Sequence, residues 1–219
     1  MKLKAWLFAA CGLAFALSAR SATFANGADV SWVSQQESSG YSFYNSSGVK
    51  TDPFVLLKNL QVNAIRLRVW VNPSGGWNDG ADVLYKAKRA AAQGQRILID
   101  FHYSDSWADP GKQTKPAAWN SHSFSQLVTD VYSHTQGILN YLKTNGVTVD
   151  YVQVGNEING GMLWPDGKTW RETPDEKIGG DSAFAALLRA GIRGVRATDE
   201  LRGRRLPVML HLAHQGDGK

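Results

Sequence analysis

The sequence contains a single cysteine, Cys11, which lies within the first 25 of its 219 residues. One cysteine cannot form an internal disulfide bond, so the chain is not a small disulfide-stapled scaffold. Cysteine pairs or histidine clusters with the spacing of a zinc site are also absent, and we predict neither a metal nor a cofactor. The fold must therefore depend on an apolar core, for which 43% hydrophobic residues are sufficient.

A strong charge of one sign is lacking too. The chain has 24 basic and 19 acidic residues, and Lys2, Lys4 and Arg20 belong to its N-terminal segment. Without these three, 21 basic residues stand against 19 acidic ones. A net charge of +2 is too small to attract a nucleic acid. The arginine-rich stretch 189–205 is interpreted as a solvated helix end, so we expect no nucleic-acid partner.

No apolar run reaches the roughly 18 residues of a membrane span. Residues 5–17 are almost wholly apolar, two lysines precede them, and small or polar residues fill positions 18–25. This order is typical of a secretory signal peptide, whereas a membrane anchor or a lipoprotein modified at Cys11 fits it less well. We therefore predict a signal peptide over 1–25, one domain over 26–219, and a secreted protein (extracellular or periplasmic) with no membrane contact after cleavage.

Beyond the signal, extended and helical patterns alternate. Apolar, β-branched runs predict strands at 27–33, 62–71, 96–101, 147–154 and 206–212. Amphipathic runs predict helices at 53–60, 81–93, 123–144 and 182–198. Asp52 followed by Pro53 is a good start for the first of these helices. Strands that alternate with helices predict an α/β fold with a parallel sheet.

Polar and aromatic residues gather directly after the strands, at 70–77, 102–119, 156–170 and from 211 onward. Such loops carry the functional residues of a (β/α) barrel. A doubly wound open sheet is the alternative, but the glycine-rich phosphate fingerprint is missing. Five predicted strands fall short of the eight in a TIM barrel. We therefore expect a (β/α)8 TIM barrel that is truncated here to about its first five βα units.

Glu157 follows the fourth predicted strand. Strand alternation places Gln153 and Glu157 on one face, which points into the barrel mouth if the strand's valines pack against helices. A glycosidase needs a carboxylic acid there that stays protonated near neutral pH. From Asn156-Glu157 alone, the sequence favours a solvated loop residue or an ion-pair partner of Arg66 or Arg68 over a catalytic acid.

The segment 100–113 carries hydroxyl, carboxylate and indole groups, the mixture that binds sugars. Asp100 and His102 share one strand face, which we expect to point inward. Five tryptophans lie in predicted loops or strand ends: Trp70, Trp77, Trp107, Trp119 and Trp164. A set of five is difficult to explain as core, whereas we expect Trp32 to be a core residue.

Arg66 and Arg68 alternate on one strand with Trp70, so all three should face inward. A buried arginine requires a carboxylate partner. We predict that Arg66 is the structural partner of Asp100, and that Arg68, which is nearer the strand end, orients the catalytic carboxylates.

Four segments together resemble glycoside hydrolase family 53, the arabinogalactan endo-β-1,4-galactanases. They are residues 64–73, 100–113, 154–158 and 162–167. The Asp-Phe-His-Tyr-Ser-Asp-x-Trp-Ala-Asp-Pro string is highly specific, whereas Asn-Glu is shared by a large clan of retaining barrel glycosidases. The resemblance implies an eight-stranded barrel that hydrolyses β-1,4-galactan side chains of pectin with retention of configuration and is a monomer when complete.

The resemblance also implies that Glu157 is the acid/base and that Asn156 contacts the sugar. With the residue analysis, the predicted substrate-binding residues are Arg68, Trp70, His102, Asp105, Trp107, Asn156, Trp164 and His211.

The family's nucleophile, a second glutamate after the seventh strand, has no counterpart in this sequence. Glu172, Glu176 and Asp217 are the late carboxylates, and none follows a predicted strand in the required position. We therefore expect no turnover by this chain alone. The alternatives are a galactan-binding protein without hydrolysis, or another β-glycanase of the same clan such as a mannanase or cellulase, which segment 102–113 disfavours.

Overall fold

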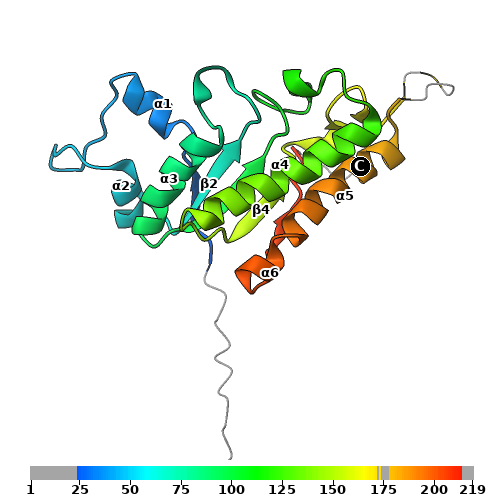
Figure 1. The fold of residues 1–219 in the computed structure, drawn as a ribbon. Helices are drawn as coiled ribbons and strands as arrows, with labels where there is room; N and C mark the ends of the chain where they lie inside the picture. Colours follow the sequence, from blue (N-terminus) through cyan, green and yellow to red (C-terminus); the bar gives the residue numbers. More distant parts are fainter. Residues whose placement is uncertain (1–23, 172, 174–177, 214–219) are drawn as a thin grey trace, which may run out of the picture.

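The computed structural model describes residues 24–171, 173 and 178–213, and Figure 1 shows its fold. Within these residues the main sheet has the strand order β1-β2-β3-β4-β7. Its strands are β1 (Gly27–Asp29), β2 (Ala64–Val69), β3 (Arg96–Phe101), β4 (Tyr151–Val154) and β7 (Val208–Met209). Every neighbouring pair is parallel, as the alternation of strands and helices predicts.

Helices connect the strands and cover one face of the sheet. They are α1 (Val33–Ser38), α2 (Pro53–Asn59), α3 (Gly80–Ala92), α4 (Phe124–Thr144), α5 (Asp181–Arg196) and α6 (Asp199–Arg202). Figure 1 shows α3, α4 and α5 crossing the sheet on the same side. Shorter elements lie in the loops: η1 (Ser74–Gly76), η2 (Ala117–Trp119), η3 (Ile158–Gly160) and an antiparallel pair, β5 (Gly161–Met162) and β6 (Gly167–Lys168).

The expected helix starts are present. The Asp52 side chain accepts a hydrogen bond of 2.7 Å from the backbone N–H of Phe54 and caps α2. Ser123 and Gln126 form a capping box at the start of α4. These local bonds satisfy N–H groups that the first turn of a helix leaves without intrahelical partners.

The predicted strand 27–33 is wrong beyond Asp29. The Asp29 carboxylate accepts a hydrogen bond of 3.0 Å from the Ser31 N–H, and Val33 N–H donates to the Val30 carbonyl at 3.0 Å. These two bonds turn the chain out of the sheet, and α1 begins at Val33. A local turn therefore replaces the second half of the predicted strand.

The sheet has an apolar face and a polar face. The side chains toward the helices are fully buried: Ile65, Leu67, Val69, Ile97, Ile99, Phe101, Val152 and Val154. The intervening positions hold Arg66, Arg68, Asp100 and Gln153. Burying the apolar face against α3, α4 and α5 supplies the hydrophobic stabilisation, and this arrangement fixes the polar residues on the opposite face, as alternation predicts.

Two predicted features lie wholly or mostly outside the described residues. Residues 1–23 carry most of the predicted signal peptide, and Glu172, Glu176 and Asp217 are likewise not described. In the described part of the chain, no helix is both long enough and apolar enough to cross a membrane.

Candidate functional site

The predicted site residues meet at one edge of the sheet. Trp70 follows β2, His102 follows β3, Glu157 follows β4 and His211 follows β7. Because the strands are parallel, their carboxyl ends lie at the same edge, where barrel enzymes carry their functional loops.

Glu157 is half-buried and adopts a left-handed conformation, with φ 52° and ψ 48°. Such a conformation is uncommon and costly for a residue other than glycine, and residues that adopt it cluster at functional sites. Among the described residues, the Glu157 carboxylate has no hydrogen-bond or ion-pair partner. Its backbone is held instead, because the next residue, Ile158, donates its N–H to the His211 carbonyl at 3.0 Å.

Asn156 is buried and has a fixed amide orientation. Its Nδ2 donates to the Ala108 carbonyl at 2.8 Å, and a carbonyl can only accept, so Oδ1 must face the other way. Oδ1 accepts from Arg66 Nη2 at 2.8 Å and lies 2.7 Å from His211 Nδ1. Since Oδ1 cannot donate, His211 Nδ1 carries the proton, and in the neutral ring Nε2 is left as an acceptor.

Asp100 lies at the centre of this network and its side chain is inaccessible to solvent. Its carboxylate forms an ion pair with Arg66 at 2.7 Å and hydrogen bonds with His102 Nε2 at 2.9 Å and Gln153 Nε2 at 2.5 Å. The predicted pairing of Arg66 with Asp100 is confirmed. Arg66 also holds Asn156, which the sequence did not indicate, so it links the strand β2 directly to the residue before Glu157.

His102 is buried and uses both ring nitrogens within the protein. Nδ1 accepts from Trp70 Nε1 at 3.3 Å and from the Ala108 N–H at 3.2 Å. Both partners can only donate, so the hydrogen of the neutral ring is on Nε2, which donates to Asp100. His102 therefore supports the residues around it. Both of its ring nitrogens are already engaged, and its predicted contact with a sugar stays a prediction.

Arg68 forms no ion pair with a carboxylate among the described residues, so its predicted role in orienting the catalytic carboxylates stays a prediction. Its guanidinium carbon lies 4.4 Å from the ring centroid of Trp32, 4.9 Å from that of Trp70 and 4.1 Å from that of Trp107. Nε and Nη2 are buried and have no hydrogen-bond partner in the described structure. Asp100 already accepts from three donors, so Arg68 packs among indole rings instead, and burial lowers its pKa to about 10.

Trp32 and Trp107 form an exposed pair of rings at the edge where the strands end, which we call the mouth. Trp32 follows β1 and Trp107 follows β3. They are 40% and 41% exposed, and their ring centroids are 5.8 Å apart. The prediction that Trp32 is a core residue is wrong, because the turn after β1 places it at the start of α1. Trp70 and Trp119, expected on the sugar-binding face, are buried. The ring of Trp70 packs edge-on against the ring of Trp107, and the two ring centroids are 6.0 Å apart.

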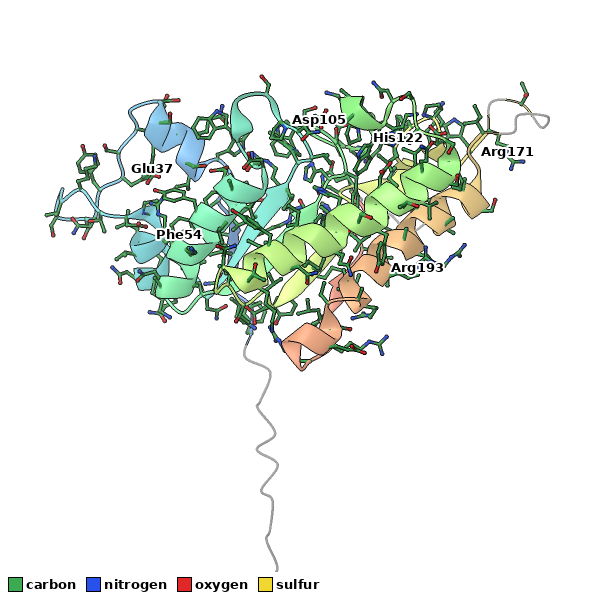
Figure 2. All side chains as sticks on the ribbon, viewed as in Figure 1. Glu37, Phe54, Asp105, His122, Arg171 and Arg193 are labelled. Atoms are coloured by element: carbon green, nitrogen blue, oxygen red, sulfur yellow. The ribbon has the colours of Figure 1, made fainter. Side chains whose placement is uncertain are left out.

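Asp105 and Trp164 organise the surrounding loops. Asp105, labelled in Figure 2, accepts from the N–H groups of Asn72 and Ala117, both at 2.8 Å. Trp164 donates its Nε1–H to the Gly160 carbonyl at 2.8 Å and packs edge-on against Trp170 at 5.2 Å. Both side chains therefore hold segments of the mouth in place, and their predicted contacts with substrate remain predictions.

Gln113 was not singled out from the sequence, although it is buried at the centre of the loops. Its Nε2 donates to the backbone carbonyls of Asn156 at 2.9 Å and Asp109 at 3.1 Å, and lies 3.3 Å from that of Glu157. One glutamine in a polar loop gives no local signal of such a role.

The parallel strands, the helices on one face and the polar residues at the carboxyl ends define part of a (β/α) barrel of the enzyme type. The chain belongs to Glycosyl hydrolase family 53, whose sequence model it matches over residues 25–218. This confirms the resemblance found in the sequence.

Two curated relatives and a solved structure agree with this assignment. The chain is 44% identical over 185 residues to the endo-beta-1,4-galactanase of Bacillus subtilis, covering 80% of this chain and 40% of that protein. It is 37% identical over 191 residues to the probable arabinogalactan endo-beta-1,4-galactanase A of Aspergillus terreus, covering 87% and 52%. The Ignisphaera aggregans GH53 catalytic domain superposes with a TM-score of 0.76 at 38% identity, covering 86% of this chain and 51% of that one. This chain spans about half the length of these proteins, and its sheet corresponds to part of a barrel.

Proposed function

We propose that this chain forms the acid/base half of a retaining endo-β-1,4-galactanase, with Glu157 as the general acid/base. The observation that carries the proposal is the position of Glu157 at the carboxyl end of β4, with a carboxylate that no described residue engages. Asn156 beside it is fixed by Arg66 and His211, so the backbone that presents the carboxylate is preorganised.

In the proposed reaction a glutamate supplied from outside the described residues, as in the family that the sequence resembles, attacks the anomeric carbon and forms a covalent bond to it. At the same time Glu157 protonates the glycosidic oxygen, and the bond to the leaving sugar breaks. Glu157 then accepts a proton from a water that attacks the anomeric carbon, which breaks the bond to the nucleophile and releases the second product. Asn156 uses one Nδ2 hydrogen on the Ala108 carbonyl, which leaves the second for a sugar hydroxyl.

We propose β-1,4-galactan as the substrate because the relatives are galactanases by name. The exposed rings of Trp32 and Trp107 suit the C–H faces of pyranose rings. A polysaccharide is degraded outside the cell, so secretion through the predicted signal peptide 1–25 belongs to the same proposal. We also propose that the complete enzyme is a monomer and uses no cofactor. Binding of galactan without turnover is the second candidate, because the Glu157 carboxylate has no carboxylate partner in the described structure.

A chimera tests the role of Glu157. This chain would be continued by the remaining part of the Bacillus subtilis endo-β-1,4-galactanase, and reducing ends released from galactan, mannan and cellulose would be measured. We expect activity on galactan only, and Glu157→Gln should lower kcat by about 10²–10⁴-fold. Glu200→Gln, an exposed substitution of the same kind on α6, is the control.

Turnover by Glu157→Gln equal to that of the control would remove Glu157 from the mechanism. Preferred cleavage of mannan or cellulose would remove galactan as the substrate.

A further inference from the structure

A hollow with polar and aromatic walls lies between α1, the loop at 39–52 and α3. We name it the α1–α3 pocket, and its volume is about 380 Å³, within the range of small-molecule sites. The lining residues used below are Glu37, Tyr41, Phe43, Asp52, Tyr85 and Arg89. In Figure 2, Glu37 lies on α1, at the opposite side of the view from His122 and Arg171.

Three charged residues that are hydrogen-bonded to one another line the pocket. Arg89 donates two hydrogen bonds of 2.7 Å to the two oxygens of Glu37 and a third of 3.0 Å to Asp52. Bidentate bonds of this kind fix both partners geometrically. With Lys50 also in the lining, two cations balance two carboxylates, so the pocket suits a neutral ligand rather than an anionic one.

Aromatic rings form the walls. Tyr41 is 67% exposed and Tyr85 is 51% exposed. Tyr85 is held by Arg89, whose Nη1 lies 3.2 Å from the phenol oxygen and whose guanidinium carbon lies 5.0 Å from the ring centroid. Exposed rings beside fixed carboxylate oxygens match a sugar, since the rings cover its C–H face and the oxygens accept from its hydroxyls.

The loop that carries Tyr41 is built as a small hairpin. Tyr44 and Lys50 form an antiparallel bridge, and the Asn45 side chain accepts from the N–H groups of Ser47 and Val49 at 3.0 and 2.9 Å. A loop ordered before binding loses less conformational entropy when a ligand arrives.

The pocket shares a lining residue with a neighbouring hollow. Phe43 lines both the α1–α3 pocket and a neighbouring hollow of about 310 Å³, which Trp32 also lines. Trp32 contacts Trp107 at the mouth. Trp32 therefore belongs both to the wall of the hollow beside the pocket and to the exposed aromatic pair after the strand ends.

We propose that the α1–α3 pocket binds a neutral stretch of the same β-1,4-galactan chain, outside the catalytic centre. The choice of galactan rests on the proposed function, whereas the neutral character of the ligand follows from the balanced charges of the pocket. The pocket would hold the polymer near the mouth and raise its local concentration there.

Affinity electrophoresis of this chain in native gels that contain β-1,4-galactan tests the proposal. Replacing both Tyr41 and Tyr85 by alanine should weaken retardation about fivefold, as expected for the loss of two ring contacts. Replacing both by phenylalanine keeps the rings and should keep most of the retardation. Tyr141→Ala, an exposed tyrosine on α4, is the control, and circular dichroism checks that each variant is folded.

The mouth variant Trp107→Ala separates the two proposals. If it weakens binding while the double alanine variant binds like the wild type, the pocket proposal is overturned and the proposed function stands. If only the double alanine variant weakens binding, the pocket is supported and the mouth loses its proposed role.

Absence of any retardation of the wild-type chain overturns the pocket proposal, and the chimera then decides the proposed function on its own. Retardation by polygalacturonate that depends on Tyr41 and Tyr85, without any by galactan, overturns the proposal of a neutral ligand.

Discussion

The side-chain amide of Gln113 donates a hydrogen bond of 2.9 Å to the backbone carbonyl of Asn156. The backbone carbonyl of Gln113 in turn accepts a hydrogen bond of 2.7 Å from the backbone N–H of Trp164. The loop after β3 and the segment that follows β4 are thereby joined on both sides of Glu157. This connection offsets the cost of about 1–2 kcal/mol that a left-handed backbone imposes on a residue such as Glu157.

Gln113→Ala should lower the free energy of unfolding by about 2–3 kcal/mol, because buried backbone carbonyls lose their donor. Gln113→Glu should be at least as harmful, since it replaces the donor by an acceptor. Urea unfolding measures both, and Gln36→Ala, an exposed glutamine on α1, should change stability by less than about 0.5 kcal/mol. Equal stability of the three variants would show that Gln113 does not hold this segment.

Glu157→Gly should raise the free energy of unfolding by about 0.5–1 kcal/mol, because glycine adopts positive φ without a steric cost. Glu157→Ala keeps the Cβ atom and should give no such gain. Thermal melts of the two variants measure the difference directly. A glycine variant less stable than the alanine variant would contradict the interpretation that this position carries backbone strain.

Arg68→Met should leave the free energy of unfolding within about 1 kcal/mol of the wild type or raise it. The substitution removes a buried charge that has no carboxylate partner among the described residues and keeps most of the volume between the indole rings. Arg68→Ala leaves a cavity and should cost about 2 kcal/mol or more. Chemical denaturation distinguishes them, and a methionine variant as unstable as the alanine variant would mean that the cation–π contacts dominate.

His134 should make stability depend on pH. Burial lowers its pKa to about 4 from the ordinary 6.5, its Nε2 has no hydrogen-bond partner in the described structure, and aromatic rings surround it. The unfolded chain binds the proton more tightly, so the contribution is fully present above pH 6.5 and is lost as the pH falls toward 4. Lowering the pH from 7.5 to 5 should cost about 1–2 kcal/mol.

Urea unfolding at several pH values measures this loss. His134→Phe should flatten the profile between pH 7 and 5, whereas His122→Asn, which removes the half-buried partner of Asp130, should leave the contribution of His134 in place. If the free energy of unfolding of His134→Phe falls with pH as steeply as that of the wild type, His134 is not the source of the pH dependence.

Local patterns predicted the parts of the site that depend on one strand at a time. Alternation in β2 and β3 placed Arg66 and Asp100 on one face, and their ion pair follows from that placement. The same rule placed Arg68 inward but did not choose its partner. In the sheet register Arg68 lies opposite Asp100, yet the guanidinium of Arg66 reaches that carboxylate instead. The two side chains are identical, so the direction that each takes decides the pairing, and sequence spacing does not give that direction.

The sequence by itself determined the alternation of strands and helices, the sidedness of each strand, the family and the position of Glu157, because these depend on local periodicity and on contiguous motifs. Only the tertiary structure decided that Trp32 joins Trp107 at the mouth, that indole rings enclose Arg68 and that Gln113 holds the backbone before Glu157. Those contacts join loops distant in sequence, and their partners are selected by the packing of the strands and helices that carry the loops.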